Sequence, residues 1–183
     1  IALVQGNPIL GDIAGNVDMI RHARARAARM GADLVLTSEL SLVGYPTEDL
    51  ILKPFFQHMA MKAAKELAEE TADGGPALIV GAPWRDADGG LYNAALIMDG
   101  GIITDRVYKS CLPNYGVFDE KRLFTSARDV APVLVRGHKL GVMICEDMWF
   151  ADTARSLADQ GSEILLVPTA SPFEANKLSE RLR

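Results

Sequence analysis

The sequence YNAALIMDGGIITDRVY occupies residues 92–108 and contains two apolar runs on either side of a tight turn. The runs cover residues 92–98 and 102–108, and Asp99-Gly100-Gly101 lies between them. Aspartate and glycine tolerate the backbone angles that tight hairpin turns require, so this pattern predicts a β-hairpin. A second hairpin is predicted at residues 133–136 and 140–144, which flank Gly137-His138. Two antiparallel strand pairs are therefore expected.

The rest of the chain alternates between strand-like and helix-like segments. Apolar strands are predicted at residues 1–5, 33–37, 77–81 and 163–167. Helices are predicted at residues 17–30, 55–71 and 151–160, the first with Asn16 as its N-cap and Gly31 at its end. Hairpins within such an alternation argue against a purely parallel, doubly wound sheet. We therefore expect an α/β fold in which helices cover sheets of mixed strand direction.

Composition indicates one globular domain, because 49% of the 183 residues are hydrophobic. The net charge is −5, and the arginines of residues 21–29 are spaced like a solvated helix face, so nucleic-acid binding is disfavoured. Two distant cysteines form neither a disulfide framework nor a zinc site, which favours a reducing compartment, most simply the cytoplasm. No apolar run reaches the roughly 18 residues of a membrane span.

Both ends of the sequence lie within predicted elements. The first residue, Ile1, already belongs to a strand, and residues 176–183 have the pattern of a helix that stops part way. We therefore expect the natural protein to be longer than this chain.

Three polar side chains with complementary chemistry follow the ends of predicted strands. Glu39 follows the strand at residues 33–37, Lys109 follows the first hairpin, and Cys145 follows the second. A carboxylate can take the proton of a thiol that attacks an amide, and a lysine can offset the charge that develops on the carbonyl oxygen. The carboxylate can then protonate the leaving ammonia and activate water. This trio predicts a cysteine-dependent amide hydrolase that needs no histidine.

Each member of the trio also has a plainer interpretation. A lone cysteine at a strand end is more often an inert buried thiol, Glu39 could cap a loop, and Lys109 could be a surface charge. Cys111 is a rival nucleophile, but no predicted strand presents it. A Cys/His pair is disfavoured because no histidine adjoins a candidate nucleophile in the sequence; the three are His22, His58 and His138.

The segments around the trio resemble motifs of the nitrilase (carbon–nitrogen hydrolase) superfamily. The segment SELSLVGYP at residues 38–46, continued by residues 48–50, is similar to its glutamate motif. Tyr108-Lys109 and the segment LPNYGVFDEKR at residues 112–122 resemble its lysine motif, in the form typical of the glutaminase domain of glutamine-dependent NAD synthetases. The segment GVMICEDMW at residues 141–149 resembles the nucleophile motif of the same branch, and residues 170–173 with Lys177 resemble its glutamine-closing segment.

The resemblance implies a fold and a set of roles. It implies an α-β-β-α sandwich, incomplete at its C-terminal end in this chain, with residues 1–183 forming one glutaminase domain. Glu39 would be the general base, Lys109 the oxyanion support and Cys145 the nucleophile. The positions where the family holds glutamine correspond to Tyr115, Ser171 and Lys177, with Glu146 as a further contact.

The same resemblance implies partners outside this chain. No metal or cofactor is expected in the glutaminase domain itself. A synthetase domain of the same polypeptide would use ATP and Mg²⁺ to convert nicotinic acid adenine dinucleotide to NAD with the ammonia released from L-glutamine, which would make the whole protein a ligase. Family members assemble through this domain, so a homo-oligomer is expected.

Three other functions remain open from the sequence. The first is a stand-alone amidase or nitrilase that acts on another small substrate; residues 115–122 and the pair Glu146-Asp147 count against it. The second is a catalytically silent domain, which the presence of all three reactive residue types disfavours. The third is an α/β ligand-binding module, for which the sequence offers no phosphate-binding glycine motif.

Overall fold

The computed structural model describes residues 1–172, 175, 177 and 179, and within them it contains two sheets and three α-helices. The strands are β1 (Ala2–Leu3), β2 (Leu34–Leu36), β3 (Ala77–Arg85), β4 (Leu91–Asp99), β5 (Ile102–Tyr108), β6 (Val133–Val135), β7 (His138–Val142) and β8 (Ile164–Leu166). The α-helices are α1 (Ile13–Arg29), α2 (Pro54–Glu69) and α3 (Ala151–Asp159). Short 3₁₀ turns are η1 (Glu48–Leu52), η2 (Glu70–Asp73) and η3 (Cys145–Trp149).

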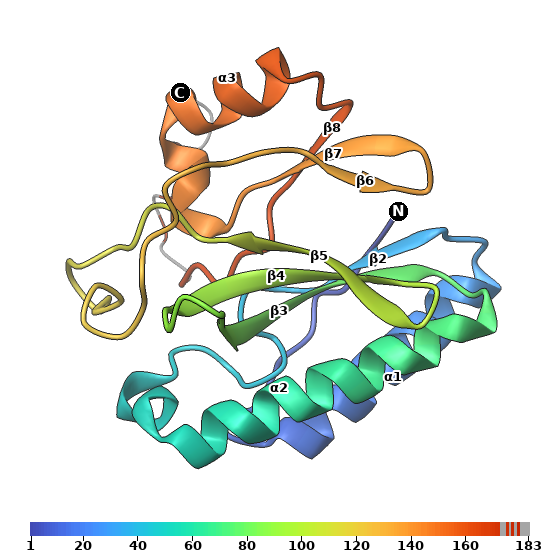
Figure 1. Cartoon of the computed structure of the whole chain (residues 1–183), viewed down its shortest axis with the longest axis horizontal. Coiled ribbons are helices and arrows are strands. Elements are labelled where there is room, and N and C mark those ends of the chain that lie inside the picture. The colour runs from blue at the N-terminus through green and yellow to red at the C-terminus, as the bar shows by residue number, and fades with distance from the viewer. Residues whose placement is uncertain (173–174, 176, 178, 180–183) are drawn as a thin grey trace.

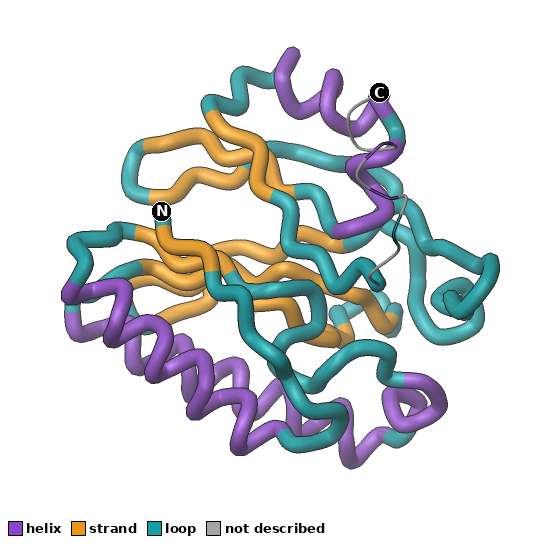
Figure 2. Tube along the Cα trace, turned by 180° about the vertical axis from the view of Figure 1, so that it is seen from behind, coloured by secondary structure: helices purple, strands orange, loops and turns teal. Residues whose placement is uncertain are grey.

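The elements stack as an α-β-β-α sandwich (Figure 1). The first sheet has the order β1-β2-β3-β4-β5, with parallel pairs from β1 to β3 and antiparallel pairs from β3 to β5. The second sheet has the order β6-β7-β8, in which β6 and β7 are antiparallel and β7 and β8 are parallel. Helices α1 and α2 cover the outer face of the first sheet, and α3 lies over the second sheet; both views show this order (Figure 2). The expected sandwich with mixed sheets is confirmed.

Side-chain alternation along the strands produces two cores. Leu78 and Val80 of β3 face the layer of α1 and α2, whereas Ile79 between them faces the second sheet. Successive side chains of a strand point to opposite faces, so a strand buried on both faces has a continuous apolar sequence. The core between the two sheets also includes Val142 and Cys145. The candidate nucleophile is therefore packed where the two sheets meet.

The first predicted hairpin is confirmed, and the second has a different turn. Strands β4 and β5 pair around Asp99 and Ile102 as expected. In the second hairpin the turn residues are Arg136 and Gly137, with φ of 49° and 89°, and His138 begins β7 instead of lying in the turn. Positive φ at both central residues matches the type I′ geometry of two-residue hairpins. Strand β7 ends at Val142, so Cys145 lies in η3 and not at the strand end itself.

The predicted start of the first helix was wrong. Helix α1 begins at Ile13, and the side chain of Asp12 caps it by accepting a hydrogen bond from the backbone N–H of Gly15. Asn16 lies inside the helix, where its buried side chain bonds to the backbone of Ile9 and Leu42. Gly31, with φ of 76°, follows the end of this helix as predicted.

The other helices and strands differ less from their predicted bounds. Strand β3 continues to Arg85, past the predicted end at residue 81, and forms a further, unpredicted hairpin with β4. Most of the helix expected at residues 176–183 lies outside the described residues. In the part of the chain that the structure describes, no helix is both long and apolar enough to span a membrane.

Gly81 of β3 allows the segment that carries Glu39 to lie against the sheet. A Cβ atom at Gly81 would lie 2.3 Å from the carbonyl oxygen of Ser38 and 2.4 Å from the backbone nitrogen of Leu40. Both atoms are backbone atoms, so neither can move aside as a flexible side chain would.

We expect Gly81→Ala to lower the free energy of unfolding by about 3 kcal/mol, because the new methyl group forces backbone apart in a packed region. Gly31→Ala is the control: no atom lies within 4 Å of a Cβ there, so only the left-handed backbone opposes it, at a cost of about 1 kcal/mol. Chemical denaturation measures both. Equal losses in the two variants would contradict the proposed close approach.

Candidate active site

Strand direction brings four segments of the chain to one edge of the sandwich. Strands β2 and β5 run in the same direction, so the segments that follow them, with Glu39 and Lys109, emerge at the same edge. Strands β7 and β8 are parallel, and the segments that follow them carry Cys145 and Thr169. Because the two sheets pack face to face, these side chains meet between their edges.

Glu39 and Lys109 form a buried ion pair. The Nζ atom of Lys109 donates to Oε1 of Glu39 at 2.6 Å, and the two side chains are 0% and 1% exposed. Glu39 also accepts hydrogen bonds from Nδ2 of Asn93 at 2.9 Å and from the backbone N–H of Ala170 at 3.1 Å. A buried charge is tolerated only when it is paired and hydrogen-bonded. The Glu39 carboxylate is therefore fixed in one orientation by three donors.

A second carboxylate shares the Lys109 ammonium. Nζ of Lys109 donates to Oε1 of Glu120 at 2.8 Å, and the hydroxyl of Tyr45 donates to the same oxygen at 3.0 Å. Burial opposes the charge of Lys109, but the charges of Glu39 and Glu120 outweigh that effect and raise the pKa of Lys109 above its usual value. Burial raises the pKa of Glu120. The lysine is therefore a permanent cation between two buried acids.

Cys145 lies beside this pair with a strained backbone. Its φ is +47°, a left-handed value that non-glycine residues seldom adopt, and its N–H donates to the carbonyl of Pro168 at 3.0 Å. The hydroxyl of Thr169 donates to Sγ at 3.1 Å. Burial, followed by the negative charge of Glu39, raises the pKa of the Cys145 thiol to about 12. The thiol is neutral at physiological pH, so attack by Sγ requires a base that removes its proton.

Cys111 has a different environment. Its thiol is partly exposed, and burial followed by the charge of Asp147 raises its pKa to about 11. No hydrogen bond is found between its sulfur and Glu39 or Lys109 among the described residues. It therefore lacks the paired base that Cys145 has.

A cavity of about 550 Å³ lies next to the trio. Tyr115 and Glu146 line it, together with Cys111, Lys121 and Phe150, whereas Glu39, Lys109 and Cys145 do not. The Tyr115 hydroxyl donates to Oε2 of Glu146 at 2.9 Å. Burial and this hydrogen bond raise the pKa of Tyr115 to about 12. The cavity thus lies against Ser110 and Glu146, the chain neighbours of Lys109 and Cys145, and is about the size that a small ligand requires.

The structure places the remaining predicted contacts nearby without linking them to that cavity. The backbone N–H of Ser171 donates to Oγ1 of Thr169 at 3.3 Å, and Nζ of Lys177 donates to the carbonyl of Pro172 at 3.5 Å. Neither side chain lines the cavity. Residue 173 of the predicted closing segment lies outside the described residues. A substrate role for Ser171 and Lys177 stays a prediction.

Glu39, Lys109 and Cys145 were expected to lie together, but the residues that hydrogen-bond to them were not predicted. Asn93 is fully buried in an apolar strand, and a lone amide in such a run is a signal of a buried hydrogen bond. Glu120 lies within the segment that resembles the lysine motif, but no function was predicted for it, because the neighbouring sequence does not show that it contacts Lys109. Thr169 lies three residues beyond the end of β8, and no sequence pattern pointed to it. Among the described residues, no group of three or more His, Cys, Asp or Glu side chains is arranged to hold a metal ion.

Comparison with known proteins agrees with this geometry. The family model described as carbon-nitrogen hydrolase matches residues 1–182. The chain is 42% identical over 181 residues to the glutamine-dependent NAD(+) synthetase of Rhodobacter capsulatus, covering 99% of this chain and 32% of that protein. It is 37% identical over 183 residues to the synthetase of Acinetobacter baylyi, of which it covers 33%. The chain thus spans about a third of the length of the curated relatives it matches.

Solved structures of related enzymes superimpose on this chain. The structure of a glutamine-dependent NAD+ synthetase from Acinetobacter baumannii superimposes with a TM-score of 0.87 at 34% identity, covering 98% of this chain and 34% of that one. An amidase from Nesterenkonia sp. AN1 superimposes with a TM-score of 0.80 at 29% identity, covering 96% of this chain and 68% of that one. In that amidase structure acrylamide has added to the active-site cysteine.

The buried thiol predicts a specific pH dependence of alkylation. In Glu39→Gln, loss of the carboxylate charge should lower the pKa of the Cys145 thiol below its native value, but burial still disfavours the thiolate and no base accepts its proton. The rate of Cys145 alkylation by iodoacetamide in this variant should therefore rise steadily with pH. The native protein should instead react measurably near pH 7. Mass spectrometry of the two cysteine peptides measures each rate, with Cys111 as the internal control. Equal Cys145 rates in both proteins at pH 7 would exclude Glu39 as the base.

Proposed function

Because the chain belongs to the carbon-nitrogen hydrolase family, we propose that it is the glutamine-hydrolysing part of a glutamine-dependent NAD synthetase. The observation that carries this proposal is the neutral Cys145 thiol beside a carboxylate, Glu39, that Lys109 holds by a buried ion pair. The similarity to synthetases of R. capsulatus and A. baumannii supports the choice of glutamine as substrate.

The first half of the reaction forms a thioester. Glu39 removes the thiol proton of Cys145 as Sγ bonds to the side-chain amide carbon of glutamine. The carbonyl oxygen gains negative charge, and the Lys109 ammonium offsets it. Glu39 then returns the proton to the amide nitrogen, the C–N bond breaks, and ammonia leaves.

The second half restores the enzyme. Glu39 takes a proton from water as the water oxygen attacks the thioester carbon, and Lys109 again offsets the charge on the oxygen. The C–S bond breaks, the proton passes to Sγ of Cys145, and glutamate is released. Glu120 contributes by keeping Lys109 charged and oriented throughout.

The cavity beside the trio provides a place for the amino-acid end of glutamine. Glu146 and the hydroxyl of Tyr115 would bind the α-ammonium group, in exchange for their present contact with each other. Ser171 and Lys177 would meet the α-carboxylate. These contacts would distinguish glutamine from simple amides, which lack both charges.

A larger protein would use the ammonia that this chain releases. The ammonia would serve the ATP- and Mg²⁺-dependent amidation of nicotinic acid adenine dinucleotide by a synthetase domain of the same polypeptide, in a cytoplasmic homo-oligomer. The two free cysteines are compatible with a reducing compartment. A stand-alone amidase is the second candidate, because the Nesterenkonia amidase superimposes with a TM-score of 0.80.

Cys145→Ala in the complete protein should abolish glutamine-dependent NAD formation and leave the reaction with free ammonium unchanged, since only the thioester step needs the thiol. Cys111→Ala is the matched control and should retain both reactions. Loss of both reactions in Cys145→Ala would assign the cysteine a structural role. Ammonia release from glutamine, asparagine and acetamide separates the two candidates: a preference for acetamide would favour the stand-alone amidase.

Glu146→Gln should raise KM for glutamine about tenfold or more, because a charged hydrogen-bond partner of the ammonium is lost. Its effect on kcat should be small, since Glu146 would bind the substrate equally in the ground and transition states. Steady-state ammonia release measures both constants. An unchanged KM would remove Glu146 from the substrate site.

A further inference from the structure

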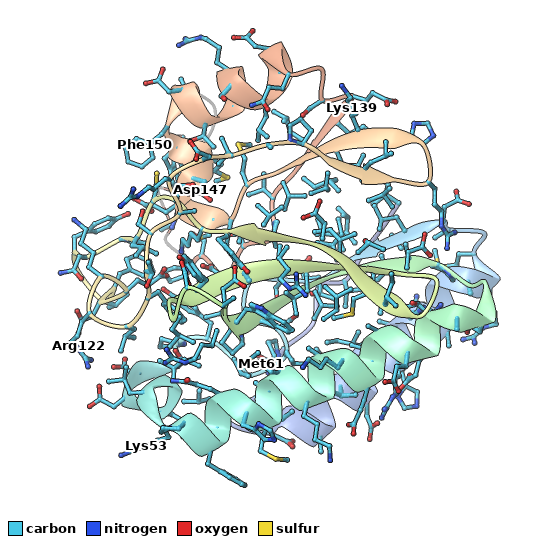
Figure 3. All side chains as sticks on the ribbon, viewed as in Figure 1. Lys53, Met61, Arg122, Lys139, Asp147 and Phe150 are labelled. Carbon is cyan, nitrogen blue, oxygen red and sulfur yellow. The ribbon has the colours of Figure 1, made fainter. Side chains whose placement is uncertain are left out.

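Asp147 is a buried carboxylate that the proposed reaction does not use. It lies in η3, two residues after Cys145 (Figure 3). Its exposed fraction is 1%. No cation pairs with it among the described residues. Its oxygens instead accept hydrogen bonds from backbone N–H groups. Its contacts are therefore structural contacts within the chain.

Both oxygens of this carboxylate are occupied, by two different segments. Oδ1 accepts hydrogen bonds from the backbone N–H of Cys111 at 2.7 Å and of Ser110 at 3.1 Å. Oδ2 accepts from the N–H of Ile144 at 2.9 Å. Ser110 directly follows Lys109, and Ile144 directly precedes Cys145. The side chain thus joins the lysine segment of the first sheet to the nucleophile segment of the second.

The same residue also closes the turn around the nucleophile. The N–H of Asp147 donates to the carbonyl of Ile144 at 3.1 Å, while its Oδ2 accepts from the Ile144 N–H. Cys145 lies within this loop at φ of +47°. A non-glycine residue keeps such a backbone only when its surroundings hold it there.

We propose that Asp147 is a positioning residue that fixes the spacing of Lys109 and Cys145 across the two sheets. This inference rests on the proposed function for the roles of those two residues. The aspartate is required because an amide of the same shape has one acceptor oxygen and would turn its NH₂ group toward one of the two segments. Either orientation places a donor against a backbone donor and releases that segment.

The test compares Asp147→Asn with Asp152→Asn in the complete protein. Asp152 is five residues away, its side chain is 95% exposed, and it pairs only with Arg155 among the described residues, so the control makes the same charge change without a role in the site. We expect kcat for ammonia release to fall about 100-fold in Asp147→Asn, as small misplacements of reacting groups do. The effect on kcat should exceed the effect on KM, since Asp147 itself does not line the cavity. A kcat within twofold of the control would overturn the proposal.

A double-mutant cycle separates positioning from a general structural role. Its readout is Cys145 alkylation by iodoacetamide at pH 7, which requires no substrate. If Asp147 acts by aligning the thiol with its base, Asp147→Asn should slow alkylation in the native background and have little further effect in Glu39→Gln. Equal slowing in both backgrounds would overturn the positioning role. A native protein that releases no ammonia from glutamine would refute the proposed function, and the cycle would still decide the role of Asp147.

Native-state hydrogen exchange covers the case in which Asp147→Asn fails to fold. In the native protein, the amides of Ser110, Cys111 and Ile144 should be protected as strongly as those of β7, because Asp147 holds all three. Exchange of these amides at the rate of the exposed turn at Gly89 would contradict the proposal.

Discussion

The buried ion pair between Lys109 and Glu39 is the interaction on which the site depends. Its two side chains come from segments 70 residues apart and meet at 2.6 Å with almost no solvent contact. Two opposite charges so deeply buried are stable only with further hydrogen bonds. Asn93, the N–H of Ala170 and Glu120 provide them, and these come from different parts of the sandwich. The hydrogen bonds that stabilise this ion pair therefore also connect distant parts of the fold.

This arrangement explains how a neutral thiol can be a nucleophile without histidine. Burial keeps the proton on Cys145, and the side chain of Glu39 is itself only 1% exposed. The cost is a strained backbone at Cys145, which hydrogen bonds to Pro168 and around Asp147 hold in place. Packing of the two sheets against each other, with Val142 and Cys145 in their shared core, sets the distance over which the thiol and the base meet.

Local patterns in the sequence predicted most of the fold and the three polar side chains that the structure brings together. Aspartate and glycine at residues 99–101 favour a tight turn, so the hairpin was predictable. The motif segments singled out Glu39, Lys109 and Cys145. The start of α1 was not predictable, because Asp12 and Asn16 are both good N-cap residues. Only the tertiary contacts of Asn16 with Ile9 and Leu42 decide between them. Glu120, Thr169 and Asp147 act through partners distant in the sequence, and no local pattern reveals such contacts.

In the proposed reaction, Cys145 carries the acyl group during turnover. Mass spectrometry of the complete protein, quenched in acid during steady-state turnover of glutamine, tests it most directly, because thioesters survive in acid. We expect a γ-glutamyl adduct on the peptide that contains Cys145 and an unmodified Cys111. Ammonia release with the adduct on Cys111 and an unmodified Cys145 would contradict this role of Cys145.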